Sequence, residues 1–205
     1  VGVPGLLILA NLILCLVMFV VIKVPGYMDA EYYYAGGLQI YRGHGFTEPY
    51  VWNYLDGINE IPRPSHTYWM PLTSILTAFG MLLSSSEGFD AARLFLITCC
   101  IFLPALIYIL AIRFGIKQRL AIIAGCLALF PGYYYPYFAT TDSFAIMAIL
   151  GVAYFLVVQE ISKSQEMRSI LWLALGGITA LMHLARAEGL LWFLSSCGVF
   201  VIRII

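Results

Sequence analysis

Charged residues are scarce in this 205-residue chain. Asp, Glu, Lys and Arg make up 11% of the residues, whereas hydrophobic residues make up 62%. A soluble domain is closer to half apolar and a quarter charged. The 11 basic and 11 acidic residues give a formal net charge of zero, so the chain lacks the basic surplus of a nucleic-acid-binding protein. The composition therefore excludes an ordinary soluble domain and argues against a nucleic-acid partner.

Motifs for structural metals and disulfides are also lacking. The three histidines have no HxxH or HxxE spacing, which makes a zinc site poorly supported. No pair of cysteines has the spacing of a metal knuckle, and all five fall inside apolar segments: Cys15, Cys99, Cys100, Cys126 and Cys197. We interpret them as small packing residues, with no disulfide framework.

Long apolar runs are what the chain has in abundance. Residues 1–22 carry no charge, which is enough helix to cross a bilayer, and no small-residue cleavage site follows them. The apolar runs predict an all-α, polytopic bundle with about six transmembrane helices, at about 4–23, 93–112, 119–138, 143–160, 170–185 and 189–205. Because the chain starts without Met and stops inside an apolar run, we expect residues 1–205 to be one membrane module of a longer protein.

A seventh apolar segment, Pro71–Leu83, is too short to span. Its 13 residues reach roughly 20 Å as a helix, against a hydrocarbon core of roughly 30 Å. We expect a juxtamembrane or re-entrant helix that Pro71 opens. The basic loops then share one face, which the positive-inside rule makes cytoplasmic, and Lys23 and Arg93 are the exceptions. This arrangement predicts a multi-pass cell-membrane protein whose residues 24–92 form a long first external loop.

The first external loop contains one of three polar clusters on the predicted outer face. Asp29 to Tyr41 has helical spacing, and Asp29 and Glu31 directly follow the first membrane helix. Either carboxylate could be a solvated residue in a helix first turn, or a general base or metal ligand at the mouth of a membrane cavity. The loop is also crowded with aromatic residues, which either anchor the chain at the interface or stack on a carbohydrate.

The second cluster lies between the third and fourth membrane helices. Pro131 and Pro136 should kink or break the end of the third helix, and such breaks are tolerated where they line a cavity. Asp142 follows, either as a cap on the next helix or as a site residue.

The third cluster lies in the tight turn between the two last, short helices. His183, Arg186 and Glu188 fall there, at a depth where an Arg and a Glu need a partner or water. Arg186 and Glu188 either pair and reach the headgroups, or Arg186 binds a lipid phosphate. The three clusters share one face, and their convergence is the main functional indication in the sequence.

The order of these motifs resembles the GT-C class of polytopic glycosyltransferases, in the branch with protein O-mannosyltransferases, lipid A aminoarabinose transferases and RgtA/B/C/D-like proteins. The similarity covers nearly the whole chain and lies in the loop start PGYMDAEYY at 25–33, GHGF at 43–46, PYVW at 49–52, SHTYWMPL at 65–72, TDS at 141–143 and RAEG at 186–189.

The resemblance implies roles for individual residues. In such enzymes the first-loop Asp is essential and is the proposed base, which maps to Asp29, and a second-loop acid corresponds to Asp142. The family's acidic pair is adjacent, whereas Ala30 separates Asp29 from Glu31 here, so Glu31 could hold part of the role. The implied substrate-binding residues are Arg186, Glu188, His66, Tyr33 and Trp52. Some relatives require a divalent metal, which Asp29 and Asp142 would hold, and others do not.

The implied reaction is inverting transfer of a sugar from a polyprenyl-phosphate donor to a lipid, glycan or protein acceptor on the extracytoplasmic face. Two other functions fit a polytopic chain. A secondary transporter would place its charges near the bilayer midplane and show internal repeats, neither of which the sequence shows. A non-catalytic membrane scaffold would leave Asp29, Asp142 and Arg186 far apart.

Overall fold

The computed structural model describes residues 2–51, 61–164 and 166–204. In these residues the chain is helical, apart from one pair of two-residue strands. The elements are α1 (Val3–Val21), α2 (Met28–Tyr41), β1 (Thr47–Glu48), β2 (Arg63–Pro64), α3 (Leu72–Ser84), α4 (Phe89–Ala92), α5 (Leu94–Arg113), α6 (Gln118–Leu129), the 3₁₀ helix η1 (Gly132–Ala139), α7 (Phe144–Lys163), α8 (Ser169–Ala185) and α9 (Gly189–Ile204). The all-α prediction is confirmed.

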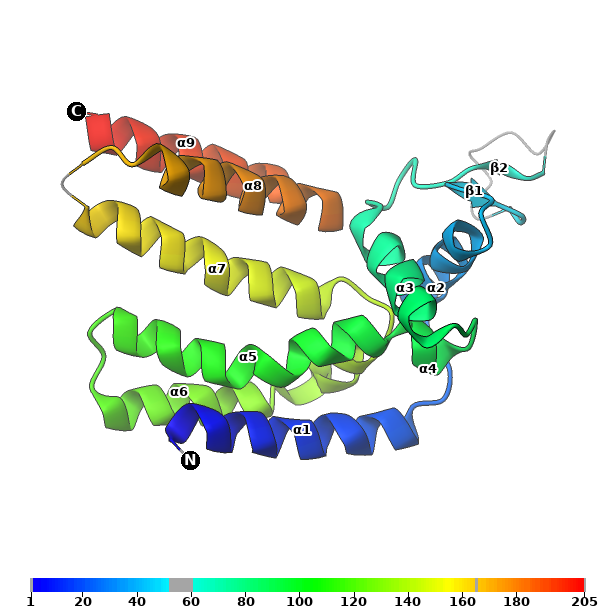
Figure 1. The fold of residues 1–205 in the computed structure, drawn as a ribbon, viewed down its shortest axis with the longest axis horizontal. Helices are drawn as coiled ribbons and strands as arrows, with labels where there is room; N and C mark the ends of the chain where they lie inside the picture. The colour runs from blue at the N-terminus through cyan, green and yellow to red at the C-terminus, as the bar shows by residue number, and fades with distance from the viewer. Residues whose placement is uncertain (1, 52–60, 165, 205) are drawn as a thin grey trace.

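The helices form two groups. Figure 1 shows α1, α5, α6, α7, α8 and α9 running alongside one another, with α2, α3 and α4 gathered at one end of them. Within the larger group, α1, α6 and α7 pack on α5, α8 packs on α7, and α9 packs on α8. All three predicted polar clusters lie in or next to the end where α2–α4 sit, because α1, η1 and α8 each finish there.

Three helices are long and apolar enough to cross a membrane: α1, α5 and α7. A fourth span is reached if α6 and η1 count as one helix bent by 64° at their junction. The two prolines account for this break, since neither Pro131 nor Pro136 can donate a helix hydrogen bond. The predicted break at the end of the third helix is therefore confirmed.

Helices α8 and α9 contain 17 and 16 residues and fall just below the usual length of a span. At 1.5 Å per residue each reaches about 25 Å. Helix α3, with 13 residues, is shorter still, as predicted for the segment from Pro71. The prediction of about six spans therefore depends on α8 and α9, and it stays a prediction.

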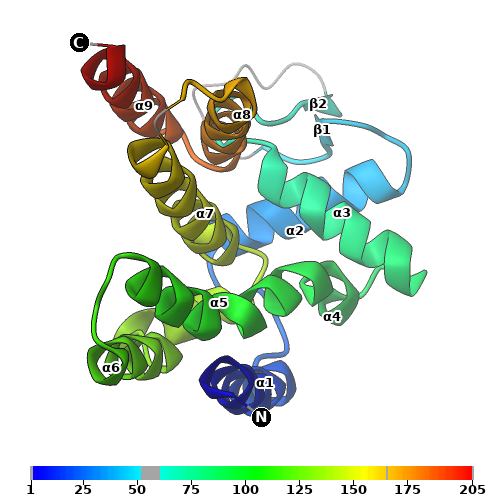
Figure 2. The same ribbon diagram turned by 60° about the vertical axis from the view of Figure 1, so that its left-hand side comes forward.

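Helices α2 and α3 pack closely because glycine faces the contact. A Cβ on Gly37 would lie 2.5 Å from Cγ2 of Thr77, and one on Gly36 would lie 2.7 Å from Oγ of Ser74. Both distances are well below normal van der Waals contact. The segment 24–92 was predicted as a long external loop with juxtamembrane helices, and its described residues include α2 and α3 packed against each other (Figure 2).

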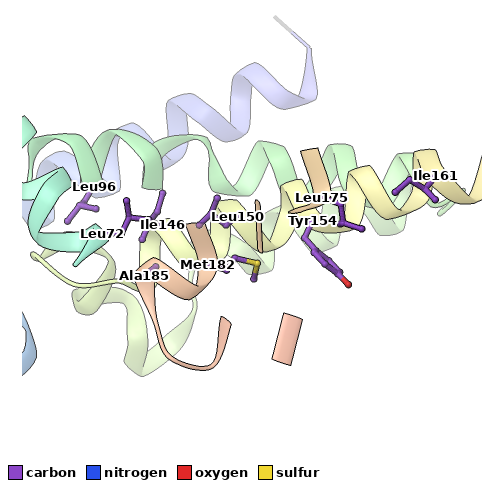
Figure 3. Packing of buried hydrophobic residues seen from close by; sticks show 9 residues of the cluster. All are labelled: Leu72, Leu96, Ile146, Leu150, Tyr154, Ile161, Leu175, Met182 and Ala185. Carbon is purple, nitrogen blue, oxygen red and sulfur yellow. The ribbon is translucent and has the colours of Figure 1, made fainter. Parts of the chain in front are cut away.

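The largest apolar core joins the two groups of helices. Its buried members come from α3, α5, α7 and α8, and Figure 3 shows them along α7: Leu72, Leu96, Ile146, Leu150, Tyr154, Ile161, Leu175, Met182 and Ala185. Leu72, in the first turn of α3, packs in the same cluster as residues of the long helices. The helical layer at the end is therefore fixed to the bundle and not tethered only by its loops.

Candidate functional site

A cavity of about 450 Å³ opens between the α2–α3 layer and the turn that joins α8 to α9. It is lined by α2, by the segment before α3 and by that turn: Asp29, Tyr33, Tyr68, Trp69, Met70, Arg186, Ala187 and Glu188. Its volume is in the range of small-molecule sites. Four residues that the sequence singled out, Asp29, Tyr33, Arg186 and Glu188, therefore face one space although they are up to 159 positions apart in the chain.

Asp29 lies in the first turn of α2 and is half-buried. Burial raises the pKa of its carboxyl above the ordinary value, and the nearby charge of Asp142 raises it further. A hydrogen bond from Trp69 and the charge of Arg186 act in the opposite direction. A carboxylate with a raised pKa is a stronger base than an exposed one, which suits a group that removes a proton.

Arg186 directly follows α8 and extends its guanidinium into the cavity. Its Nη2 and Nε donate to the two carboxylate oxygens of Glu188, at 3.0 and 3.3 Å, and its Nη1 donates to Oγ of Ser143 at 3.3 Å. The pairing with Glu188 raises the pKa of Arg186, so the group is a permanent cation. A guanidinium has five N–H donors. Three are used among the described residues, and two remain for a ligand.

Asp142 is buried behind the cavity and does not belong to its described lining. Its Oδ2 accepts a hydrogen bond from the Tyr27 hydroxyl, and its Oδ1 accepts from the backbone N–H and the hydroxyl of Ser143. The alternative in which Asp142 is the N-cap of the fourth membrane helix is not what the structure shows, since the N-cap of α7 is Ser143 and Asp142 bonds the backbone N–H of that residue alone. Asp142 instead connects Tyr27 to Ser143, which in turn reaches Arg186.

Tyr33 and Glu31 lie on different faces of α2. Tyr33 is buried and lines the cavity, so the alternative in which it anchors the chain at a membrane surface is wrong. Glu31 is exposed and is not among the described residues that line the cavity. Of the two loop carboxylates, the geometry favours Asp29 as the site residue. Trp52, predicted to bind substrate, lies outside the described residues.

His66 occupies a turn and lies outside the described lining of the cavity. Its backbone is in the left-handed region, with φ of 61°, and its N–H donates to the Tyr32 hydroxyl. Its two ring nitrogens bond the hydroxyls of Ser65 and Ser74, at 2.6 and 2.9 Å. Burial lowers the pKa of His66 to about 4. This is a neutral histidine that ties the turn before α3 to the α2–α3 contact.

Tyr68, Trp69 and Met70 form a wall of the cavity that sequence reasoning assigned to no role. They come directly before Pro71, and Tyr68 is 71% exposed. The rings of Tyr68 and Trp69 contact each other, with their centroids 4.5 Å apart, and the ring centroid of Trp69 lies 5.2 Å from that of Tyr32. The sequence feature that could have indicated this wall was an aromatic pair shortly before the proline that opens α3. Residues at that place precede the helix and are not part of it.

A divalent metal between Asp29 and Asp142 does not fit the side chains present. Across 2–51, 61–164 and 166–204, no three Asp, Glu, His or Cys side chains gather as a metal-binding group. Both carboxylate oxygens of Asp142 already accept hydrogen bonds from Tyr27 and Ser143. The chemistry derived below therefore uses the chain's own side chains.

Protein-family models, curated proteins and solved structures show no match to this chain.

Proposed function

We propose that this chain is the membrane module of a glycosyltransferase that moves a sugar from a polyprenyl-phosphate carrier to an acceptor on the extracytoplasmic face. The observation that supports it is one cavity, at the end of the apolar helices, that holds a half-buried carboxylate and an arginine with two unused donors. The apolar helices would keep the carrier's isoprenoid chain in lipid while its sugar phosphate enters the cavity. The pairing of a base with a phosphate-binding cation is what this transfer needs.

The proposed reaction is a single displacement. Asp29 removes the proton of an acceptor hydroxyl while that oxygen attacks the anomeric carbon. The bond between the anomeric carbon and the phosphate oxygen breaks, and the configuration inverts. The electron pair of this bond stays on the lipid phosphate, whose increased negative charge Arg186 stabilises by charge-assisted hydrogen bonds. Asp29 ends protonated and returns its proton to water.

The aromatic wall of the cavity supports a sugar as ligand. Tyr68 and Trp69 line the cavity together with Asp29, and aromatic rings suit the C–H surface of a pyranose. Glu188, which pairs with Arg186, can also accept hydrogen bonds from sugar hydroxyls.

The proposed topology has six spans, with α8 and α9 as the two shortest and with α2–α4 outside. It is tested by single cysteines in a background without the five native ones. Thr67→Cys and Ser86→Cys, both at exposed positions, should react with an impermeant maleimide on intact cells. Lys117→Cys, between α5 and α6, should react only after permeabilisation. Reaction of the variant at 86 only after permeabilisation would show that α3 spans the membrane and that the arrangement is wrong.

The activity is tested with the purified full-length protein in nanodiscs and a panel of polyprenyl-phosphate sugars. We expect transfer from at least one donor, lost in Arg186→Ala and kept in Glu166→Gln, a carboxylate substitution outside the site. Turnover by Arg186→Ala equal to that of the wild type would refute the assigned role. Uptake of a solute without transfer from any donor would favour a transporter instead.

A further inference from the structure

We propose that Tyr27, Asp142 and Ser143 are positioning residues that hold the Arg186 guanidinium in the orientation that binds the carrier phosphate. The proposal rests on the proposed function, because it deepens the role of Arg186 in that site. It assigns to Asp142 a different role from the catalytic second-loop acid or metal ligand that sequence similarity implied.

The three residues form one continuous chain of hydrogen bonds to Arg186. The Tyr27 hydroxyl donates to Oδ2 of Asp142, whose Oδ1 accepts the Ser143 hydroxyl at 3.1 Å. Because that hydroxyl gives its proton to Asp142, its oxygen lone pairs are free to accept Nη1 of Arg186, at 3.3 Å. The carboxylate thus fixes the direction in which Ser143 presents its acceptor.

Burial makes Asp142 unsuited to direct chemistry. Its exposed fraction is 1%, that of Ser143 is 0%, and neither lines the described cavity. Tyr27 also lies outside that lining; its ring faces a separate, mostly apolar cavity of about 670 Å³ between the end of α1 and η1. Their hydrogen bonds reach the first cavity only through Arg186, which lines it.

The segment that carries Asp142 is itself fixed to α2. The Thr141 hydroxyl donates to the carbonyl oxygen of Ala30 at 2.7 Å, and Ala30 is the neighbour of Asp29. The Tyr27 hydroxyl also lies 3.3 Å from Oγ1 of Thr140. Residues 140–143 therefore connect the proposed base on one side to the phosphate-binding cation on the other, and they set the separation between the two.

The arrangement of the guanidinium shows why a third anchor is useful. Glu188 binds the edge of the guanidinium formed by Nε and Nη2. The Glu188 side chain is 57% exposed, so on its own it would let the guanidinium move with it. Ser143 adds a contact on Nη1 from a side chain that is itself immobilised. The two N–H donors that remain, one on Nη1 and one on Nη2, are then held in a fixed position, which matters for a planar group that binds phosphate with paired donors.

The experiment measures the dissociation constant of undecaprenyl phosphate for the full-length protein in nanodiscs, so that neither the sugar nor the acceptor need be known. Ser143→Ala should weaken binding about 3- to 10-fold, in line with the loss of one hydrogen bond to a charged group. Tyr27→Phe should also weaken the binding of undecaprenyl phosphate. Tyr154→Phe is the matched control, because it removes a hydroxyl that bonds Ser195, away from the site.

A double-mutant cycle separates positioning from a general loss of structure. In an Arg186→Ala background, Ser143→Ala should have no further effect on binding, because Ser143 acts through the guanidinium. In an Arg186→Lys background, Ser143→Ala should likewise have no further effect on binding. A lysine ammonium lacks the planar fork of donors that Ser143 would orient. Equal loss in both backgrounds, or binding by Ser143→Ala equal to that of the wild type, would overturn the positioning role alone. No binding of undecaprenyl phosphate by the wild-type protein would overturn the proposed function, and the positioning role with it.

Discussion

Replacement of Arg93 by Met should destabilise the protein strongly although Arg93 is far from the cavity lining. Its side chain is completely buried, between the rings of Phe19 and Phe89, each centred 4.5 Å from the guanidinium carbon. It donates to the carbonyl oxygens of Phe19 and Ala139, at 2.7 and 3.2 Å, and to the carboxylate of Asp90. The first two are carbonyls at the ends of α1 and η1, where no helical partner exists.

The magnitude follows from those carbonyls. A buried acceptor left unpaired costs about 1–3 kcal/mol, so two cost about 2–6 kcal/mol. Methionine fills much of the space and removes a buried charge, which offsets part of this loss. We therefore expect the free energy of unfolding to fall by about 2–4 kcal/mol.

The assay is unfolding by SDS in mixed micelles, followed by far-UV circular dichroism. Arg119→Met, at an exposed position, is the matched control and should stay within about 0.5 kcal/mol of the wild type. Arg93→Lys should be intermediate, since one ammonium cannot serve carbonyls on two helices as a planar guanidinium does. If Arg93→Met were as stable as Arg119→Met, the bonds to Phe19 and Ala139 would not be holding the helix ends.

Three further outcomes follow from the site and the helix contact. Asp29→Asn should lower the rate of sugar transfer by about 10²–10⁴-fold with little effect on donor binding, whereas Glu31→Gln should not, and the reverse result would move the base to Glu31. The rate of transfer by the wild type should rise with pH as Asp29 loses its proton. Asp142→Asn removes the like charge that raises the pKa of Asp29, so the midpoint of the pH–rate profile should move to lower pH. An unchanged or higher midpoint would contradict the assigned cause. Gly37→Ala should destabilise the fold by about 1–3 kcal/mol in the SDS assay, and a second change, Thr77→Ala, should recover part of the loss if the 2.5 Å contact is the reason.

The elements of this fold were largely predictable because they depend on local signals. The run of apolar residues gave the long helices, the spacing from Asp29 to Tyr41 predicted α2, and Pro71 marked the start of α3. Gly43, with φ of 79°, follows the end of α2, where a glycine in the left-handed region is common. Each of these features is determined by residues within a few turns of one another.

The site was predictable only in part, because its geometry depends on contacts between distant segments. The sidedness of the charged clusters indicated that Asp29 and Arg186 would meet. No local pattern indicated that Asp142 would sit behind them, bonded to Tyr27, which precedes it by 115 positions. Nor could the spacing show that Tyr68 and Trp69 close the cavity, since that depends on how the turn before α3 is folded around His66.

Arg93 shows that the role of a charged residue also depends on contacts that the sequence does not reveal. Counted along the sequence, it was an exception to the distribution of basic residues between the two faces. In the structure its charge is neutralised inside the protein by Asp90 and helix-end carbonyls. A buried and paired cation contributes little to the orientation of a chain in a membrane, so Arg93 is not evidence against the predicted topology.

The turn between α8 and α9 has a consequence for motion. A Cβ on Gly189 would lie 2.2 Å from the backbone nitrogen of His183, and no change of side-chain rotamer can relieve a contact with backbone. The amide of Arg186 bonds the carbonyl of Met182, and the amide of Gly189 bonds the carbonyl of Arg186. Backbone contacts therefore join the first turn of α9 to the last turn of α8 and to Arg186. Any displacement of α9 along the bundle would carry Arg186 toward or away from Asp29, so the separation of base and cation would change with the position of a helix whose own side chains lie outside the cavity.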